Sequence, residues 1–324
     1  MRLALFPAAA LLLASTAQAT ELNAEQQAWL DELSQQFELP LPELTAALEQ
    51  ANYQQSIIDT MTRPAEGKPW HQYRPIFLTE KRLRQGLEFW QNNEASLARA
   101  ARELQVPPQI ITAIIGVETF YGNHMGKTRV LDALYTLGFH YPPRGAFFRS
   151  EFGHYLRLAK EQGWSLTEQN GSYAGAMGMG QFISSSYRHF ALDFNDDGTR
   201  DLFSTIDAIG SVANYFREHN WHWDEEVAYP ARVADEEAVA TLLDSTLEIS
   251  NSWAELNEAG VRLDVPLSPE TPVKLIRLDG EAGPEYWVVR HNFYVITRYN
   301  RSPLYAMAVY QLSEQLKQAY EQSR

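Results

Sequence analysis

Hydrophobic positions along this chain recur mainly at the three- and four-residue steps of α-helices. Residues 25–61 show this spacing, with Pro40 and Pro42 separating two helices, and residues 80–104 show it again over one long helix. Residues 63–75 are rich in proline and aromatic side chains, which predicts an irregular loop. The first part of the chain is therefore predicted to be helical on both sides of one loop.

The pattern changes between residues 224 and 291. Residues 273–278 and 286–290 are β-like apolar runs, and Asp279-Gly280 and Gly283-Pro284 separate them as turn residues do. Residues 305–320 return to helical spacing. The chain is therefore predicted to be mainly α, with a small β-containing insertion before its C-terminal helix.

One carboxylate, Glu118, follows the most apolar of the helical stretches. Ile111, Ile114 and Ile115 share its face in a helix that starts at Pro107-Pro108 and stops near Gly122. Burial removes water from a carboxyl group and raises its pKa, so that it can donate a proton near neutral pH. Glu118 is therefore a candidate general acid. The alternative is a structural glutamate that reaches solvent at the helix end or pairs with an arginine.

The N-terminus has the pattern of an export signal. Arg2 precedes an apolar stretch, and Ala17-Gln18-Ala19 matches a cleavage site, so residues 1–19 are expected to be a signal peptide. The apolar stretch is too short to span a membrane. The chain has 0 cysteines, and hence no site for a disulfide or a lipid anchor. We expect a periplasmic protein with neither a membrane span nor a lipid anchor.

Composition and motifs exclude several kinds of function. The 324 residues carry a formal net charge of −14, which disfavours nucleic acid and anionic membrane surfaces as partners. The sequence contains no Gly-x-Ser-x-Gly elbow and no phosphate-binding P-loop, and it offers no thiol nucleophile. No organic cofactor is expected.

A glycine-rich segment, residues 171–182, follows Glu118 in the sequence. Its glycines allow the backbone to lie close to another helix or to a sugar ring. Gln181 offers a donor and an acceptor that suit an acetamido group, and Phe182 could stack on a sugar face. Tight helix packing, with Gln181 as a buried strut, is the alternative.

Residues 193–204 match the calcium loop of an EF-hand. Gly198 occupies the sixth position, and hard oxygen ligands fall at positions one, three, five and seven. Ser204 replaces the glutamate of position twelve, and Asp207 could supply that ligand from the next helix. The candidate calcium ligands are Asp193, Asn195, Asp197, Thr199 and Asp207. An ordinary turn is the alternative, and a bound calcium ion is expected to be structural.

Several motifs stand together in one order. They are Gly116-Val117-Glu118-Thr119, Met125-Gly126-Lys127-Thr128, Gly175-Ala176-Met177-Gly178, Gly180-Gln181-Phe182, residues 207–215, Asn292-Phe293 and Tyr299-Asn300. From about residue 68 to the C-terminus the chain resembles the lytic murein transglycosylase B family of bacterial cell-wall enzymes. The resemblance implies a lysozyme-like α core with an EF-hand-like calcium loop, an N-terminal helical domain and a small β domain. We therefore expect an N-terminal helical region at 20–107, the catalytic core at 108–223, the β-containing subdomain at 224–290 and a return to the core at 291–324.

The same resemblance implies cleavage of the β-1,4 bond between N-acetylmuramic acid and N-acetylglucosamine, leaving 1,6-anhydromuramic acid ends. Glu118 falls on the family's catalytic glutamate. The residues themselves show no second acid in an obvious pairing motif, and Asp132 is the nearest candidate in the sequence for a second carboxylate. The implied substrate-binding residues are Tyr73, Ser172, Gln181, Phe182, Tyr215, Tyr299, Asn300 and Tyr305. The expected partner is the glycan strand of peptidoglycan, and the sequence identifies no protein partner. A hydrolytic muramidase on the same fold and a non-catalytic peptidoglycan-binding scaffold are the alternatives.

Overall fold

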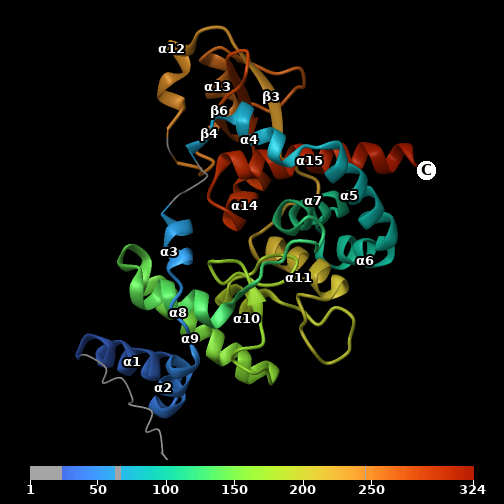
Figure 1. Cartoon of the computed structure of the whole chain (residues 1–324). Coiled ribbons are helices and arrows are strands. Elements are labelled where there is room, and N and C mark those ends of the chain that lie inside the picture. Colours follow the sequence, from blue (N-terminus) through green and yellow to red (C-terminus); the bar gives the residue numbers. More distant parts are fainter. Residues whose placement is uncertain (1–23, 63–66, 245) are drawn as a thin grey trace, which may run out of the picture.

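The computed structural model describes residues 24–62, 67–244 and 246–324. The molecule is elongated, with α1 and α2 at one end, a unit built around a small sheet at the other, and the remaining helices between them (Figure 1). The expected signal peptide lies outside the described residues. None of the described helices is both long enough and apolar enough to cross a membrane.

Helices make up most of the described chain. Those of the N-terminal half are α1 (Ala24–Phe37), α2 (Leu41–Gln50), α3 (Gln55–Met61), α4 (Trp70–Phe77), α5 (Glu80–Asn92), α6 (Glu94–Leu104), α7 (Pro108–Thr119), α8 (Val130–His140) and α9 (Gly145–Gln162). The later helices are α10 (Ser184–Phe190), α11 (Thr205–Glu218), α12 (Glu236–Val239), α13 (Trp253–Glu258), α14 (His291–Tyr299) and α15 (Pro303–Gln322). The mainly α class and the C-terminal helix are confirmed.

Two predictions for the first part of the chain are wrong in detail. The long helix of residues 80–104 is divided at Asn93, whose side-chain amide donates to the Phe89 carbonyl at 2.8 Å and so competes with the helical bonds. Residues 70–75, predicted as loop, belong to α4 despite Pro75. Trp70 is completely buried, so tertiary packing overrides the local signal. Residues 63–66 lie outside the described part.

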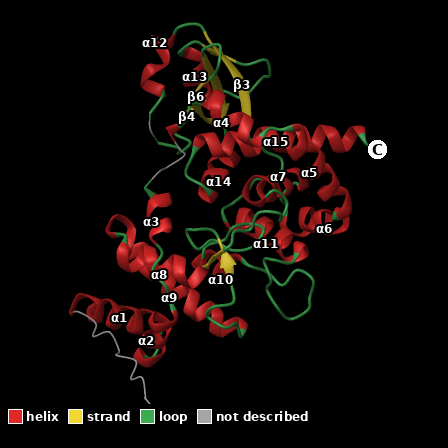
Figure 2. Ribbon diagram, viewed as in Figure 1, coloured by secondary structure: helices red, strands yellow, loops and turns green. Residues whose placement is uncertain are grey.

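The strands form a small antiparallel unit, apart from a two-residue pair near the glycine-rich segment (Figure 2). That pair is β1 (Thr128–Arg129) with β2 (Asn170–Gly171). The five-stranded sheet has the order β4-β6-β7-β3-β5, from β3 (Ala228–Val233), β4 (Asn251–Ser252), β5 (Val261–Arg262), β6 (Pro272–Asp279) and β7 (Pro284–Val289). The two predicted β runs are therefore confirmed as the hairpin β6–β7.

Strand β6 explains how this sheet joins the rest of the molecule. Val273 and Leu275 pack into the core of the β unit, whereas Ile276 and Leu278 belong to the large core of the helices. Neighbouring side chains of a strand point to opposite faces, so both faces of β6 are buried and its apolar run is nearly continuous. The β unit is thus fastened to the helical core.

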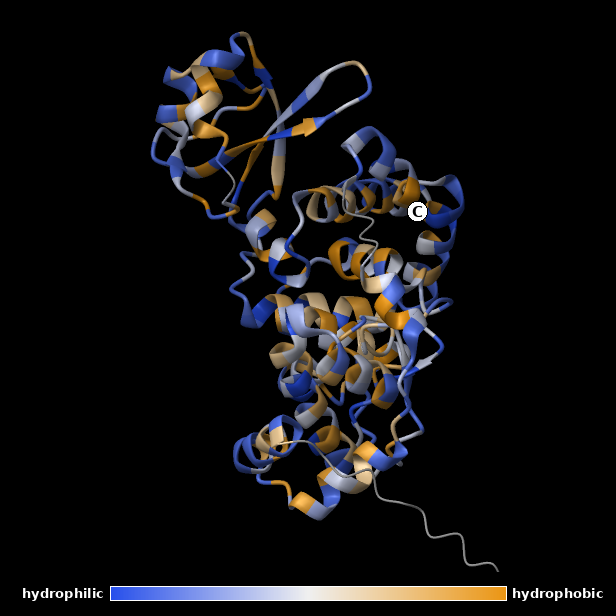
Figure 3. Ribbon diagram, turned by 60° about the vertical axis from the view of Figure 1, so that its left-hand side comes forward, coloured by the Kyte–Doolittle hydropathy of each residue, from blue (hydrophilic) through white to orange (hydrophobic). Residues whose placement is uncertain are grey.

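The helical core surrounds α7, which packs against α5, α6, α11 and α15. Hydrophobic segments gather in these central helices and in the strands, while hydrophilic segments mark the outer turns (Figure 3). Ile110, Ile111, Ile114 and Ile115 are at most 2% exposed. The predicted helix from Pro108 is confirmed, and Glu118 lies in its last turn.

Candidate active site

Glu118 combines an apolar environment with one polar partner. Its side chain is only partly accessible, and burial raises the pKa of the carboxyl group from 4.5 to about 7. The Tyr305 hydroxyl donates a hydrogen bond to Oε1 at 2.5 Å, which partly offsets this rise. Glu118 therefore carries its proton for a large fraction of the time near neutral pH, as a general acid must.

Tyr305 is placed by the start of α15. Ser302 caps this helix and accepts the Tyr305 backbone N–H at 3.3 Å, which fixes the first turn of α15. From this turn the Tyr305 side chain reaches Glu118 on α7. Burial, together with the neighbouring Glu118, raises the pKa of Tyr305 well above its ordinary value. Tyr305 thus stays protonated and can only donate to the carboxylate.

The end of α7 is fixed to the glycine-rich segment through Thr119. Its hydroxyl donates to the Met179 carbonyl at 2.9 Å and accepts the Gly122 N–H at 3.0 Å. The helix ends because Phe120 adopts a left-handed conformation, with φ at 53°. Tyr299, from α14, donates to the Gly180 carbonyl at 2.5 Å. These contacts bring the glycine-rich segment beside the catalytic candidate.

Two glycines allow the segment to lie where it does. Gly126 has φ at +93°, and a Cβ there would stand 2.0 Å from the Gly171 carbonyl oxygen. Gly178 has φ at +72°, and its Cβ would stand 2.5 Å from Leu202. Both positions therefore require glycine for conformation and for space.

Gln181 is turned partly into its own loop. Its amide nitrogen donates to the carbonyls of Gly178 at 3.0 Å and Met125 at 3.3 Å. Within the described chain no donor is assigned to its amide oxygen, which remains to accept from a ligand. Ser172 likewise serves the loop, since its hydroxyl accepts the N–H groups of Ala174 and Ala176. Both residues shape the segment.

A cavity of about 610 Å³ opens beside this segment. Its walls include Arg144, Phe147, Gln181, Phe182, Ile183, Ser186, Tyr215, Arg298, Tyr299 and Arg301. Phe182 is only 2% exposed, so it supports the neighbouring Tyr215 and Tyr299 rings and has no open face for stacking on a sugar. The Tyr215 hydroxyl donates to the Arg298 carbonyl at 2.6 Å.

The remaining predicted substrate residues, Tyr73, Asn300 and Tyr305, are not among the residues that line this cavity. Tyr73, on α4, is near enough to Tyr305 to contribute to the rise of its pKa. Asn300 follows α14 and is exposed. Glu118, like Tyr305, is not among the residues that line the cavity. Tyr299 lines the cavity and also lies near Glu118, since burial and the Glu118 charge raise the Tyr299 pKa.

Sequence reasoning missed the three arginines of the cavity. Arg144, Arg298 and Arg301 form no salt bridge with any carboxylate in the described ranges, although the chain as a whole is acidic. Arg144 lies over the Phe147 ring at 4.4 Å. Arg298 and Arg301 lie together at the end of α14, whereas Arg144 comes from just before the start of α9, so only the fold brings the three side chains to one cavity.

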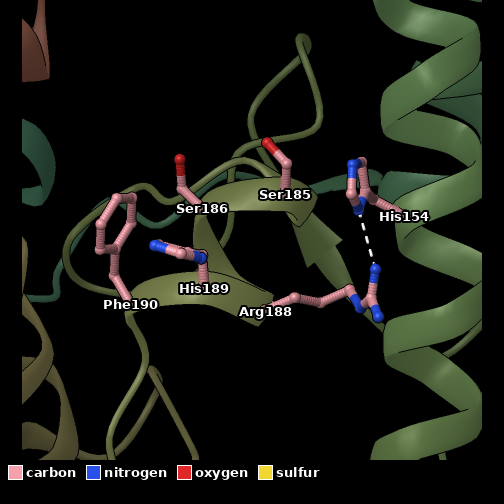
Figure 4. A pocket seen from close by; sticks show the side chains of 6 residues that line it. All are labelled: His154, Ser185, Ser186, Arg188, His189 and Phe190. Carbon is pink, nitrogen blue, oxygen red and sulfur yellow. Dashed lines mark hydrogen bonds between the residues drawn. The ribbon is translucent and has the colours of Figure 1, made fainter.

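A second cavity, of about 430 Å³, adjoins the first and shares Ser186 with it. Figure 4 shows His154 on α9 facing Arg188 on α10, with 2.9 Å between His154 Nδ1 and the guanidinium. Burial and the Arg188 charge lower the His154 pKa. The residues that line this cavity include no carboxylate, so it contains no candidate for Glu118's role.

Asp132, the nearest candidate for a second carboxylate, has a structural role. It is 2% exposed, and its oxygens accept the Asn52 backbone N–H at 2.9 Å and the Gln54 side-chain amide at 3.0 Å. It therefore braces the connection between α2 and α3. No carboxylate is among the groups that shift the pKa of Glu118.

The loop of residues 193–204 is curled around its own polar side chains. Asp193 accepts the N–H groups of Asp197 at 3.1 Å and Gly198 at 2.8 Å. Asp197 accepts the Thr199 hydroxyl at 2.6 Å, and the Asn195 amide donates to Asp197 at 2.9 Å. Among the described residues, no three His, Asp or Glu side chains already stand close enough together to hold a metal ion.

Asp207 anchors this loop from α11. It is completely buried, and its two oxygens accept the N–H groups of Phe194 and Asp201, both at 2.8 Å. Burial raises its pKa, and the charges of Asp193 and Asp197 raise it further. A cation would relieve this repulsion, and carboxylate, amide and carbonyl oxygens are the donors that calcium prefers. The donor set fits calcium, and Asp207's part as a ligand stays a prediction.

A proton-bearing glutamate beside an aromatic cavity, carried on a mainly helical core, defines a glycan-cleaving enzyme of the lysozyme-like class. The family model described as the transglycosylase SLT domain matches residues 20–314. This chain belongs to that family.

Individual proteins are similar over nearly the whole chain. Membrane-bound lytic murein transglycosylase B of Escherichia coli K12 is 39% identical over 302 residues, covering 90% of this chain and 82% of the relative. The catenated lytic transglycosylase SltB1 of Pseudomonas aeruginosa superposes with a TM-score of 0.86 at 44% identity, covering 92% and 98% of the two chains. The Escherichia coli lytic transglycosylase Slt35 in complex with calcium gives 0.82 at 40% identity, covering 91% and 93%.

Proposed function

We propose that this protein cleaves the glycan strands of peptidoglycan between N-acetylmuramic acid and N-acetylglucosamine, and leaves 1,6-anhydromuramic acid ends. The observation that carries the proposal is the raised pKa of Glu118, at about 7, beside the Tyr305 hydroxyl and the aromatic cavity. Family membership and the names of the relatives support the same activity.

The reaction needs one group that gives a proton and then takes one. In the first step Glu118 protonates the glycosidic oxygen, the bond from that oxygen to C1 breaks, and the N-acetylglucosamine hydroxyl leaves. In the second step the Glu118 carboxylate takes the proton of the muramyl C6 hydroxyl, whose oxygen forms a bond to C1. The carboxyl group is regenerated and no water is consumed. A pKa near 7 serves both steps, because neither form of the group is rare.

The positive charge that develops at C1 needs a partner other than a second carboxylate. Asp132 is engaged elsewhere, as described above. The acetamido group of the substrate can stabilise C1, as in substrate-assisted glycosidases. In this proposal the amide oxygen of Gln181 and the ring of Tyr299, which line the cavity, would orient a sugar there. The three arginines of the same cavity support binding of a polymer that carries carboxylates.

Calcium is the second part of the proposal. Asp193, Asn195, Asp197, Thr199 and Asp207 would hold the ion, which supplies charge neutralisation and rigidity and takes no part in the bond cleavage. The calcium complex of Slt35 supports this assignment. We also propose export to the periplasm, where the substrate lies, and the division of the chain at residues 107, 223 and 290.

Mass spectrometry of the muropeptides released from purified peptidoglycan tests the activity. Anhydro ends, which lack one water relative to reducing ends, are the expected products. Reducing ends would identify a hydrolytic muramidase, and binding without release would identify a scaffold. Either result overturns the proposal.

A further inference from the structure

Helix α4 lies between the sheet of the β unit and the helical core (Figure 1). On the side of the sheet, the indole N–H of the completely buried Trp70 donates to the Glu285 carboxylate at 3.2 Å. His71 Nδ1 lies 3.2 Å from the Asp279 carbonyl oxygen. Asp279 is the last residue of β6 and Glu285 is the second residue of β7, so the two partners lie on either side of the β6–β7 turn. The hairpin therefore holds the first turn of α4 at two points.

The other end of α4 is held from the core by Arg82. Its guanidinium donates to the carbonyls of Ile76 at 2.6 Å and Phe77 at 2.9 Å, and to the Gly116 carbonyl at 3.1 Å. Gly116 lies one half-turn before Glu118 on α7. Arg82 is 9% exposed, so each carbonyl replaces water that the buried charge has lost. The last turn of α4 is therefore in fixed register with the catalytic helix.

Tyr73 lies between these two attachments. Its ring is 6.4 Å from that of Trp70 and 5.1 Å from that of Phe77. It is partly exposed, and α4, which carries it, packs against α15, which carries Tyr305 at its first turn. The position of Tyr73 relative to Glu118 thus depends on the hairpin at one end of α4 and on Arg82 at the other.

We propose that the β6–β7 hairpin is a positioning element of the active site, in which Glu285 and His71 hold α4 so that Tyr73 forms a wall of the glycan site beside Glu118. In this arrangement the β unit braces the catalytic core and is not a separate binding module. The inference rests on the proposed function, because Tyr73 matters only if a glycan occupies the site.

A double-mutant cycle isolates this effect. Glu285→Met removes the acceptor for Trp70 and keeps the length of the side chain. It is expected to lower kcat/KM on peptidoglycan about five- to tenfold, a value within the range of coupling between residues in contact. In a Tyr73→Ala background the same change should cost less than about twofold, since the residue through which it acts is gone. Glu285→Gln keeps an oxygen acceptor and should restore nearly full activity.

Two further variants protect the test from a folding defect. His71 is exposed, so His71→Phe removes the second attachment with little risk to folding, and we expect the same pattern at about two- to threefold. Glu281→Met, in the exposed turn of the same hairpin, is the matched control and should change nothing. The pH at which activity falls should stay the same in all of these variants, because none of them touches the contact between Glu118 and Tyr305.

Equal losses in both Tyr73 backgrounds would mean that the hairpin acts through overall stability, and no loss in Glu285→Met and His71→Phe would mean that it does not act at all. Either outcome overturns the inference. Failure of the proposed function looks different, because the unchanged protein itself would then release no anhydro products.

Discussion

The catalytic candidate and the proposed calcium loop shift the pKa values of their carboxyl groups in opposite directions. Glu118 sits on an apolar helix with one hydrogen-bond donor, and burial raises its pKa to about 7. Asp197 sits in an exposed loop, where hydrogen bonds from Thr199 and Asn195 lower its pKa. The difference shows that the environment decides whether an acid side chain is protonated near neutral pH or stays ionised and can bind a cation.

The two regions nevertheless share a boundary. The Met179 N–H donates to the Leu202 carbonyl at 2.9 Å, and the Thr119 hydroxyl donates to the Met179 carbonyl. One peptide segment thus lies between the loop and the end of α7. If the regions differ as described, changes at Glu118 should alter chemistry and changes at the loop should alter stability.

The largest effect is expected from Glu118→Gln. The amide has nearly the shape of the acid but can neither give nor take the proton, so the rate of anhydromuropeptide release should fall by at least about 10²-fold. Turnover is measured on purified peptidoglycan, with glycan binding by the same variant as the control for an intact site. Full activity would remove Glu118 from its proposed role.

The stability of the same variant supplies a second check on the pKa. A carboxyl group whose pKa is raised in the folded state binds its proton more tightly than in the unfolded chain. The stability it contributes is therefore complete below about 4.5 and is lost as the pH rises through about 7. Glu118→Gln avoids this loss, so at pH 8 it should be more stable than the unchanged protein, by as much as about 3 kcal/mol. At pH 4 the advantage should vanish.

A smaller effect is expected from Tyr305→Phe. Loss of the hydroxyl removes the one hydrogen bond that lowers the Glu118 pKa, so the pH above which activity falls should move upward. Activity at the optimum should drop about tenfold, as the loss of a hydrogen bond to a charged group implies. The pH–rate profile measures both. An unchanged profile would show that Tyr305 does not tune Glu118, and Tyr310→Phe, which lacks this contact, is the matched control.

Sequence alone predicts what depends on local order. The isoleucine spacing before Glu118 identifies a helix with a buried face, and the raised pKa follows from that burial. The hairpin β6–β7 is also local, because its two runs are joined by a short turn. In both cases neighbouring residues carry the whole signal.

What sequence misses depends on distant contacts. Tyr305 meets Glu118 across 187 residues, and no periodicity links two such positions. Helix α4 forms although its composition predicts a loop, since the burial of Trp70 and the bonds from Arg82 to two carbonyls outweigh the effect of an internal proline. The sequence suggested that Phe182 could stack on a sugar, because nothing near it in the chain shows its burial. The two tyrosines that bury it come from α11 and α14.

The smallest effect on chemistry is expected from removal of calcium. An ion at one hundred times its dissociation constant stabilises the folded state by about 2.7 kcal/mol, and excess chelator removes that contribution. For a domain of this size the melting temperature should fall by about 5–10 °C. Well below the transition the cleavage rate should stay the same, because Glu118 keeps its apolar surroundings and its bond to Tyr305 without the ion.

Asp193→Asn is the matched variant, and its melting temperature should respond little to chelator. A melting curve that chelator leaves unchanged would argue against a stabilising ion. A cleavage rate that falls in step with calcium loss at low temperature would instead show that the segment through Met179 transmits the state of the loop to the active site.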